Sequence, residues 1–278
     1  MKKHYGKCAL CQTEGELSFE HIPPQSSFNS SPAKPVTGDL LMLDDDRMPW
    51  ETDGLPYSNQ QRGMGKYSLC KSCNNLTGTW YGDDYKLMAH IINHALSQLI
   101  NPNVKGIGIR EIHPLRFIKQ VLSMFCSLNN NDDSRFESLR KFVLDRDAVG
   151  LDKQKYKLCM YFTKSNIIKY APLSVLLRMG NDQYESIALS EITAYPLGFI
   201  LYFDPSATWE YEGIDITGFS DCAYNDEASV EMPLCIKEVN DIFPAHYRSK
   251  EEIIECVEKN KKWAEDNDVN IPRYKSLK

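Results

Sequence analysis

Hydrophobic positions recur with the 3.6-residue period of a helix in the middle of the chain. This period predicts one helix over residues 84–100, closed by Pro102, and a second over 114–128. Two further helices are expected at 134–144 and 250–266. The apolar positions of the first helix are Leu87, Met88, Ile91, Ile92, Ala95, Leu96, Leu99 and Ile100. These segments predict a helical middle region.

Beyond the third helix the pattern changes to short apolar runs that are rich in β-branched and aromatic residues. Strands are expected at residues 156–162, 174–177, 184–189 and 197–203, because turn residues separate these runs. The four runs predict a mainly β C-terminal domain.

The N-terminal part alternates between ordered and irregular stretches. A short alternating segment predicts a strand at residues 17–22, which Pro23 ends because proline cannot donate a hydrogen bond to a ladder. Residues 25–66 are rich in Ser, Pro, Gly, Asp and Asn, and we expect a long surface excursion with at most a short strand at 40–43. Ordered structure is expected to resume at residues 67–70, after this irregular stretch.

These patterns predict an α+β protein of two parts. An N-terminal module is expected at residues 1–101, with the insertion 25–66, and a C-terminal α+β domain at 102–278. The C-terminal domain carries no motif of its own, so its expected role is recognition of a substrate, a protein partner or a second copy of the chain. No apolar run approaches the ~18 residues of a membrane span. The first residues lack the apolar segment of a secretory signal, and we expect a cytoplasmic protein.

Composition and charge restrict the kinds of partner. The chain has 278 residues, of which 42% are hydrophobic and 25% are charged, as in ordinary globular proteins. Its net charge of −6 excludes a protein that coats nucleic acid through bulk electrostatic attraction. Any contact with nucleic acid must therefore be local, through a few placed cations and a divalent metal.

Four of the nine cysteines form two Cys-x-x-Cys pairs: Cys8 with Cys11, and Cys70 with Cys73. Each pair places two thiolates on one tight turn, and two such turns complete a tetrahedral four-thiolate zinc site. Residues 12–69 between the pairs exceed the ~15–20 residues of simple ribbons, which predicts a hairpin plus an insertion. Free or redox-active thiols are the alternative, but a thioredoxin-like pair needs a βαβ context that neither pair has.

Further residues around the two pairs complete a pattern. Glu20 and His21 follow the first pair, while Asn74 directly follows the second pair and Gly78 comes four residues later. With these residues the sequence resembles the zinc-bearing HNH endonucleases over residues 5–82. The resemblance implies a ββα-metal (treble-clef) fold, in which structural zinc pins a helix against a hairpin.

The resemblance also implies roles for these residues. Glu20 and Asn74 would be oxygen ligands of one catalytic Mg²⁺ or Mn²⁺ ion, and His21 would deprotonate a water that attacks a phosphodiester. The implied substrate is nucleic acid, with DNA expected, and a setting in restriction or anti-phage defence is expected from the resemblance alone. Asn75 competes for the ligand role, and an N-cap is the second interpretation of Asn74.

The chain departs from the family pattern at two positions. Gly65 stands where an Asn usually supports the histidine loop, and Thr77 stands where a Lys is common. Asn59 and Gln60 are candidates to replace that support. Both departures weaken the expectation of catalysis more than the expectation of the fold.

Three cations lie close to the second cysteine pair: Arg62, Lys66 and Lys71. They are expected to bind phosphates, and solvated side chains are the alternative interpretation. The main alternative function is a catalytically inactive zinc scaffold that binds nucleic acid or a protein partner. The acidic balance and the missing Asn favour this alternative.

Overall fold

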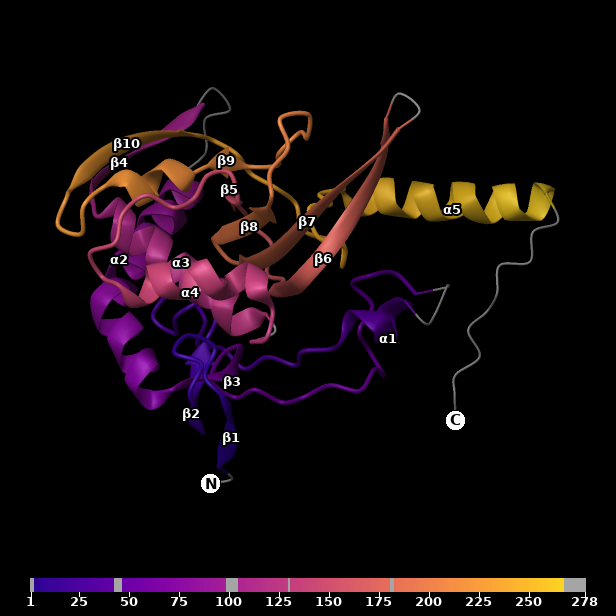
Figure 1. The fold of residues 1–278 in the computed structure, drawn as a ribbon. Coiled ribbons are helices and arrows are strands. Elements are labelled where there is room, and N and C mark those ends of the chain that lie inside the picture. Colours follow the sequence, from indigo (N-terminus) through magenta and orange to yellow (C-terminus); the bar gives the residue numbers. More distant parts are fainter. Residues whose placement is uncertain (1–2, 43–46, 99–104, 130, 181–182, 268–278) are drawn as a thin grey trace.

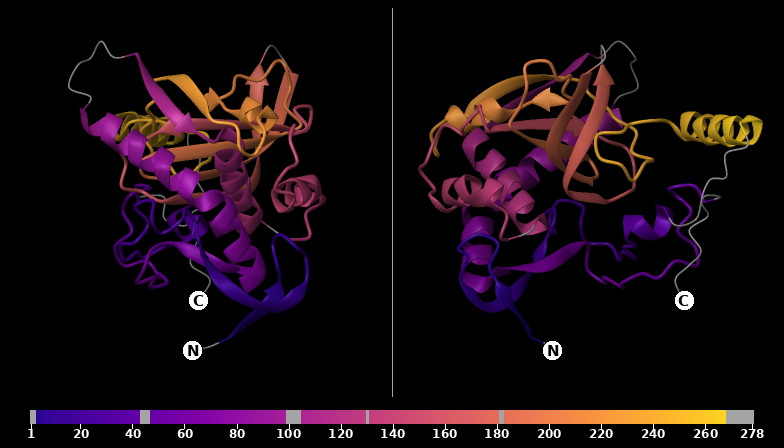
Figure 2. Two further views of the ribbon diagram at one scale, coloured as in Figure 1. Left: turned by 90° about the vertical axis from the view of Figure 1, so that its left-hand side faces the viewer. Right: turned by 45° about the vertical axis from the view of Figure 1, so that its right-hand side comes forward.

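The structure is a computed structural model that describes residues 3–42, 47–98, 105–129, 131–180 and 183–267 (Figures 1 and 2). The described residues form helices and strands arranged in several sheets, so the expected mixture of α and β elements is confirmed. No helix in these residues is both long enough and apolar enough to cross a membrane.

The N-terminal module is a small antiparallel sheet that leads into a long helix. Its strands are ordered β1 (His4–Lys7), β2 (Glu14–His21) and β3 (Gly65–Cys70). At the far end of the β2–β3 pair, His21 lies opposite Gly65. The sheet therefore brings together residues on both sides of the insertion.

The helix α2 (Lys71–Gln98) begins directly after β3 and continues for 28 residues. Periodicity predicted this helix only at 84–100, of which residues 99–100 lie outside the described part, although the resemblance implied a helix beside the zinc. Gly78 and Gly82 lower the local helix propensity, so periodicity did not reveal the first turns. Tertiary contacts stabilise these turns instead, since Tyr81 is fully buried. One helix thus joins the small sheet to the centre of the molecule (Figure 1).

The helix α3 (Pro114–Leu128) lies at the centre of the molecule and has the bounds that the sequence predicted. All of its residues except Arg116 are buried. The predicted helix at 134–144 consists of a 3₁₀ turn, η1 (Ser134–Phe136), followed by α4 (Glu137–Leu144). Periodicity was therefore a reliable guide to the helical middle region.

A five-stranded antiparallel sheet in the order β6-β7-β8-β5-β9 forms much of the C-terminal half. Its strands are β5 (Tyr156–Phe162), β6 (Lys169–Gly180), β7 (Gln183–Ala194), β8 (Leu197–Phe203) and β9 (Ile214–Asp215). The first four contain the four predicted strands, and β5 and β8 match them to the residue. The hairpin of β6 and β7 extends beyond the rest of the sheet (Figure 1).

A second, two-stranded sheet was not predicted. It pairs β4 (Gly106–Ile112) with β10 (Ala228–Pro233), which lie far apart in the sequence. Glycines in β4 interrupt the apolar alternation, and glycine disfavours strands on its own. A further 3₁₀ turn, η2 (Thr217–Asp221), follows β9. Long-range pairing therefore stabilises elements that carry weak local signals.

The expected strand at 40–43 is wrong, because residues 38–42 form the short helix α1 (Gly38–Met42) and residue 43 lies outside the described part. A short apolar run does not distinguish a helix from a strand. The C-terminal helix α5 (Lys250–Asp266) agrees with the prediction and begins with a capping box of Ser249 and Glu252. It extends away from the rest of the molecule (Figures 1 and 2).

One hydrophobic core joins the N-terminal module to the C-terminal sheet. Leu69 of β3, Met88 of α2, Phe117 of α3 and Phe199 of β8 all belong to the same buried cluster. The domain boundary expected at residue 101 lies outside the described residues. Buried side chains on either side of that boundary share this core, so the module packs directly on the C-terminal half.

Candidate metal centre and nuclease site

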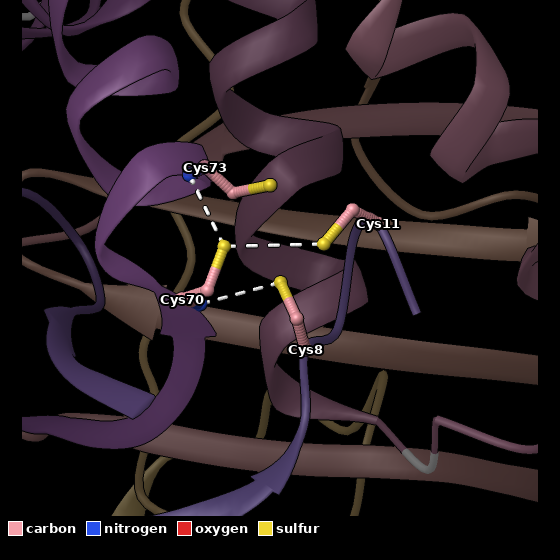
Figure 3. A group of neighbouring side chains, drawn as sticks. All are labelled: Cys8, Cys11, Cys70 and Cys73. Carbon is pink, nitrogen blue, oxygen red and sulfur yellow. Dashed lines mark hydrogen bonds between the residues drawn. The ribbon is translucent and has the colours of Figure 1, made fainter. Parts of the chain in front are cut away.

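Four sulfur atoms meet where two distant segments of the chain come together (Figure 3). Cys8 and Cys11 lie on the turn between β1 and β2, whereas Cys70 ends β3 and Cys73 lies in the first turn of α2. All four atoms lie within 4.8 Å of one another, and the Cys11 and Cys70 sulfurs are 3.9 Å apart. A tetrahedron of Zn–S bonds of about 2.3 Å has edges of about 3.8 Å. The spacing therefore fits a four-coordinate metal site such as one for zinc.

The protonation of the sulfur cluster also fits a cation. The hydrogen bond from Cys73 lowers the pKa of Cys8 to about 4, and the same hydrogen bond raises the pKa of Cys73. Burial raises the pKa of Cys70, while the backbone amides of Cys70 and Cys73 donate to sulfur at 3.3 and 3.4 Å. Thiolates this close repel one another, so full ionisation requires a bound cation.

The first cysteine turn is fixed to the rest of the molecule by hydrogen bonds. The backbone N–H of Ala9 donates to the carbonyl of Ser68 on β3, at 2.8 Å. The Arg140 Nε of α4 donates to the carbonyl of Ala9, at 3.1 Å, and the Gln12 amide donates to the carbonyl of Cys8. These bonds set the turn against β3 and α4 without involving the sulfur atoms.

His21 is the last residue of β2, and its ring is held in one orientation. Its Nε2 lies 2.9 Å from the carbonyl oxygen of Arg62, and its ring meets the edge of Phe19 with 5.0 Å between centroids. A carbonyl only accepts hydrogen bonds, so Nε2 must carry the proton. In the neutral ring Nδ1 is then the free acceptor, which is the atom that could take a proton from water.

Asn29 holds the chain that follows His21, and the sequence did not reveal it. Its amide nitrogen donates to the carbonyls of Pro23 and Met64 at 2.7 and 2.8 Å, and its Oδ1 accepts from the Met64 N–H at 2.7 Å. The side chain is 2% exposed. Asn29 lies in the insertion that was expected to be a surface excursion, and its partner Met64 is 35 residues away in sequence. No local signal could have identified it.

Gln60, a predicted candidate for supporting the histidine loop, does contact the strand opposite His21. Its side chain accepts from the N–H of Gly65 at 2.9 Å and donates to the carbonyl of Gly65 at 3.3 Å. Asn59 instead accepts a hydrogen bond from the side chain of Gln61. Gln60 and Asn29 therefore both hold backbone that lies next to His21 or to Gly65, its partner across the sheet.

Asn74 lies in the first helical turn after β3, and its side chain reaches back to β2. The amide nitrogen donates to Ser18 Oγ at 3.0 Å and to the carbonyl of Phe19 at 3.2 Å. Asn74 follows the cysteine Cys73 directly, so the sulfur cluster fixes the start of the helix against this strand. The structure thus brings Asn74 to the strand that carries Glu20 and His21.

Glu20 is 6% exposed, and burial raises the pKa of its carboxyl group to about 8. Side chains alternate along a strand, and the ring contact of Phe19 with His21 places these two on one face of β2. Glu20 therefore points to the opposite face. Among the described residues, no hydrogen bond joins the side chains of Glu20, His21 and Asn74 to one another.

The three cations expected to contact phosphates lie in different surroundings. Arg62 and Lys71 are exposed, on the loop before β3 and at the first position of α2. Lys66 is exposed as well, but its ammonium donates to the carbonyl of Leu128 at 2.9 Å, and desolvation by the surrounding protein lowers its pKa. Lys66 is therefore engaged at the C-terminal end of α3, whereas Arg62 and Lys71 face solvent.

Comparisons with known proteins give no match: no family model, no curated protein and no solved structure resembles this chain significantly. The chemistry of the site therefore rests on its own residues.

Proposed function

We propose that this protein is a metal-dependent endonuclease of the HNH kind that hydrolyses phosphodiester bonds in DNA. One observation carries the proposal. The four-sulfur cluster joins the first turn of α2 to the small sheet, and the Asn74 amide lies 3.2 Å from the carbonyl of Phe19, two residues before His21. A structural zinc ion at this cluster would fix that arrangement.

In the proposed reaction His21 acts as the general base. Its Nδ1 takes the proton from the attacking water, while the hydrogen bond from Nε2 to the Arg62 carbonyl keeps the ring oriented. Glu20 and Asn74 would hold a Mg²⁺ or Mn²⁺ ion, which would supply positive charge against the negative charge that develops on the phosphate. Burial disfavours the ionised form of Glu20, and binding of a divalent cation would offset that effect.

The surroundings of the site suit a local contact with nucleic acid. The exposed side chains of Arg62 and Lys71 flank the strand and the helix that carry the proposed site. Cations that contact phosphates position a substrate without selecting its sequence. Recognition or assembly is the role we propose for the C-terminal half.

The test is nicking of plasmid DNA in the presence of Mg²⁺ or Mn²⁺. We expect His21→Ala to lower the rate by about 100-fold or more, because it removes the general base. His94→Ala is the matched control, since His94 is exposed on α2 away from β2. Both variants should retain the zinc content and melting temperature of the wild type. A folded wild-type protein that cleaves no DNA with either metal would reject the proposal.

A second candidate is an inactive zinc scaffold that binds nucleic acid or a protein partner. The burial of Glu20 favours it, because the carboxyl group points away from the face of β2 that carries His21. Binding of DNA without cleavage, unchanged by His21→Ala, would support the scaffold over the nuclease.

A further inference from the structure

A large cavity lies between the insertion and the C-terminal half of the molecule. It has a volume of about 760 Å³, within the range of small-molecule sites. Four aromatic side chains line it: Phe28 and Trp50 from the insertion, and Tyr170 and Tyr195 from the C-terminal half. Phe28 is 39% exposed although it lines the cavity, so its ring is accessible to a ligand.

The cavity contains a buried hydroxyl group that lacks a partner. Ser27 is 1% exposed, and its Oγ makes no hydrogen bond with the described residues. A buried polar group without a partner is costly, and native proteins retain few of them. Its Oγ has less than 1 Å² of accessible surface, so a ligand can bond with this hydroxyl only where the cavity wall moves aside.

Two charged side chains in the lining are buried but already paired. Lys169 contacts the carboxylate of Glu191 at 2.9 Å, and Asp241 accepts from Arg248 at 2.7 Å. A third, Lys34, has its ammonium over the ring of Tyr57. An anionic ligand would therefore meet the buried carboxylate of Asp241 and, at Lys169, an ammonium that is already neutralised. This arrangement disfavours a phosphate group in the cavity.

The wall of the cavity also holds the chain that directly follows His21. The Tyr170 hydroxyl donates to the carbonyl of Ile22, and Asn29, which lines the cavity too, donates to the carbonyl of Pro23. Phe28, next to Asn29, adopts a left-handed backbone conformation with φ of 67°, which is unusual for a bulky residue. A ligand in this cavity would therefore lie beside Ile22 and Pro23, the residues that directly follow His21.

We propose that this cavity binds a single nucleobase. Aromatic side chains offer flat surfaces for stacking, and a planar base carries a hydrogen-bonding edge that the Ser27 hydroxyl could meet. A purely apolar ligand would leave the Ser27 hydroxyl unpaired. The cavity adjoins Ile22 and Pro23, which directly follow His21, so we expect the base to come from a bound DNA strand, from which it has unstacked. This origin of the base rests on the proposed nuclease function.

The experiment measures binding with the His21→Ala protein, so that cleavage plays no part. The first probe is a short single-stranded DNA in which one abasic site is moved along the strand. We expect one position at which loss of the base weakens binding by about tenfold, and we expect Phe28→Ala to abolish that difference. The second probe is each of the four deoxynucleoside 5′-monophosphates, which report a free nucleotide as the source.

The Ser27→Ala variant tests the hydroxyl directly. It should weaken binding of the probe by about three- to tenfold, because it removes a hydrogen bond to the base. Removing an unpaired buried hydroxyl should leave the melting temperature unchanged or raise it. Ser123→Ala is the matched control, since the Ser123 hydroxyl in α3 is also buried and without a partner but lines no part of this cavity.

The outcomes separate the two proposals. A single position at which loss of the base weakens DNA binding supports a nucleobase site that takes its base from a strand. Binding of a free nucleotide that depends on Ser27 supports a nucleobase site that takes a free nucleotide. A flat abasic series together with no nucleotide binding that depends on Ser27 overturns the inference, whatever the nicking assay shows. A nucleobase site without any nicking by the wild type would remove the nuclease and leave this cavity assignment standing.

Discussion

The small N-terminal sheet and the five-stranded C-terminal sheet are stabilised by different means. All seven residues of β8 are buried, and the sheet that contains it packs on α3. In the N-terminal sheet, by contrast, Tyr5 of β1 is 69% exposed and Tyr67 of β3 is 36% exposed. Apolar burial stabilises the C-terminal sheet, whereas four sulfur atoms gather at the N-terminal sheet. Glu20 and His21 lie on the sheet with the poorer core, and Asn74 lies on the helix turn beside the sulfur atoms, so metal binding and activity should depend on each other.

The largest effect is expected from breaking the sulfur cluster. In Cys70→Ser the bound zinc should be lost, and the free energy of unfolding should fall by about 5 kcal/mol or more, because metal binding contributes to folding. Metal analysis and denaturant unfolding measure the two effects. Cys222→Ser is the matched control, since this half-buried cysteine lies outside the cluster. Retention of zinc by the Cys70 variant would contradict the comparison.

Removing a large side chain from the C-terminal core should lower the stability of the protein without affecting metal binding. Phe199 of β8 is fully buried, with its ring centroid 6.0 Å from those of Tyr85 and Phe117. We expect Phe199→Ala to lower the free energy of unfolding by about 4 kcal/mol. The folded variant should still bind one zinc ion per chain. Loss of zinc from the folded variant would show that the two regions do not differ in the way described.

The buried carboxyl group of Glu20 should make stability depend on pH. Its pKa is raised to about 8 in the folded chain from 4.5, so the folded state holds its proton more tightly. The contribution of Glu20 to stability should therefore be greatest below pH 4.5 and fall as the pH rises towards 8. Glu20→Gln should remove this dependence and raise the free energy of unfolding by about 3 kcal/mol near pH 7.

These measurements on Glu20 are made without magnesium or manganese, which would favour the ionised carboxylate. Glu16→Gln provides the control, because Glu16 is an exposed residue on the same strand. Parallel pH profiles for wild type and the Glu20 variant would contradict the role assigned to burial.

The smallest of these effects is expected at Asn29. Asn29→Ala removes the hydrogen bonds to the carbonyls of Pro23 and Met64 and to the N–H of Met64, and it leaves these backbone groups unsatisfied. We expect a loss of about 2 kcal/mol in the free energy of unfolding. Nicking should fall much further than this loss of stability predicts, because the loop after His21 loses its support. Asn59→Ala is the control, and equal effects of both substitutions on nicking would contradict a positioning role.

The sequence predicted best where the signal is local. The apolar period of residues 114–128 gave the bounds of α3, and the aromatic run at 197–203 gave those of β8. The two Cys-x-x-Cys pairs predicted a metal cluster for a similar reason, since each pair is a local turn. Only the meeting of the two turns depends on the fold, and the structure brings all four sulfur atoms together.

Features that depend on distant contacts could not be predicted. The first turns of α2 contain two glycines and are stabilised by burial, as at Tyr81. The partners of Asn29 become neighbours only when the insertion folds back on β3. The positions of Glu20, His21 and Asn74 as ligands and base stay predictions, because they depend on how the site adjusts when a cation binds.

The continuous helix α2 also acts as a lever between the two halves of the molecule. Its 28 residues span about 42 Å, with Asn74 near one end and buried side chains at intervals from Cys73 to Leu96. A rigid tilt of about 5° about its C-terminal end would displace Asn74 by about 3 Å. Small rearrangements among the buried side chains of the C-terminal half would thus be magnified at the proposed catalytic residues.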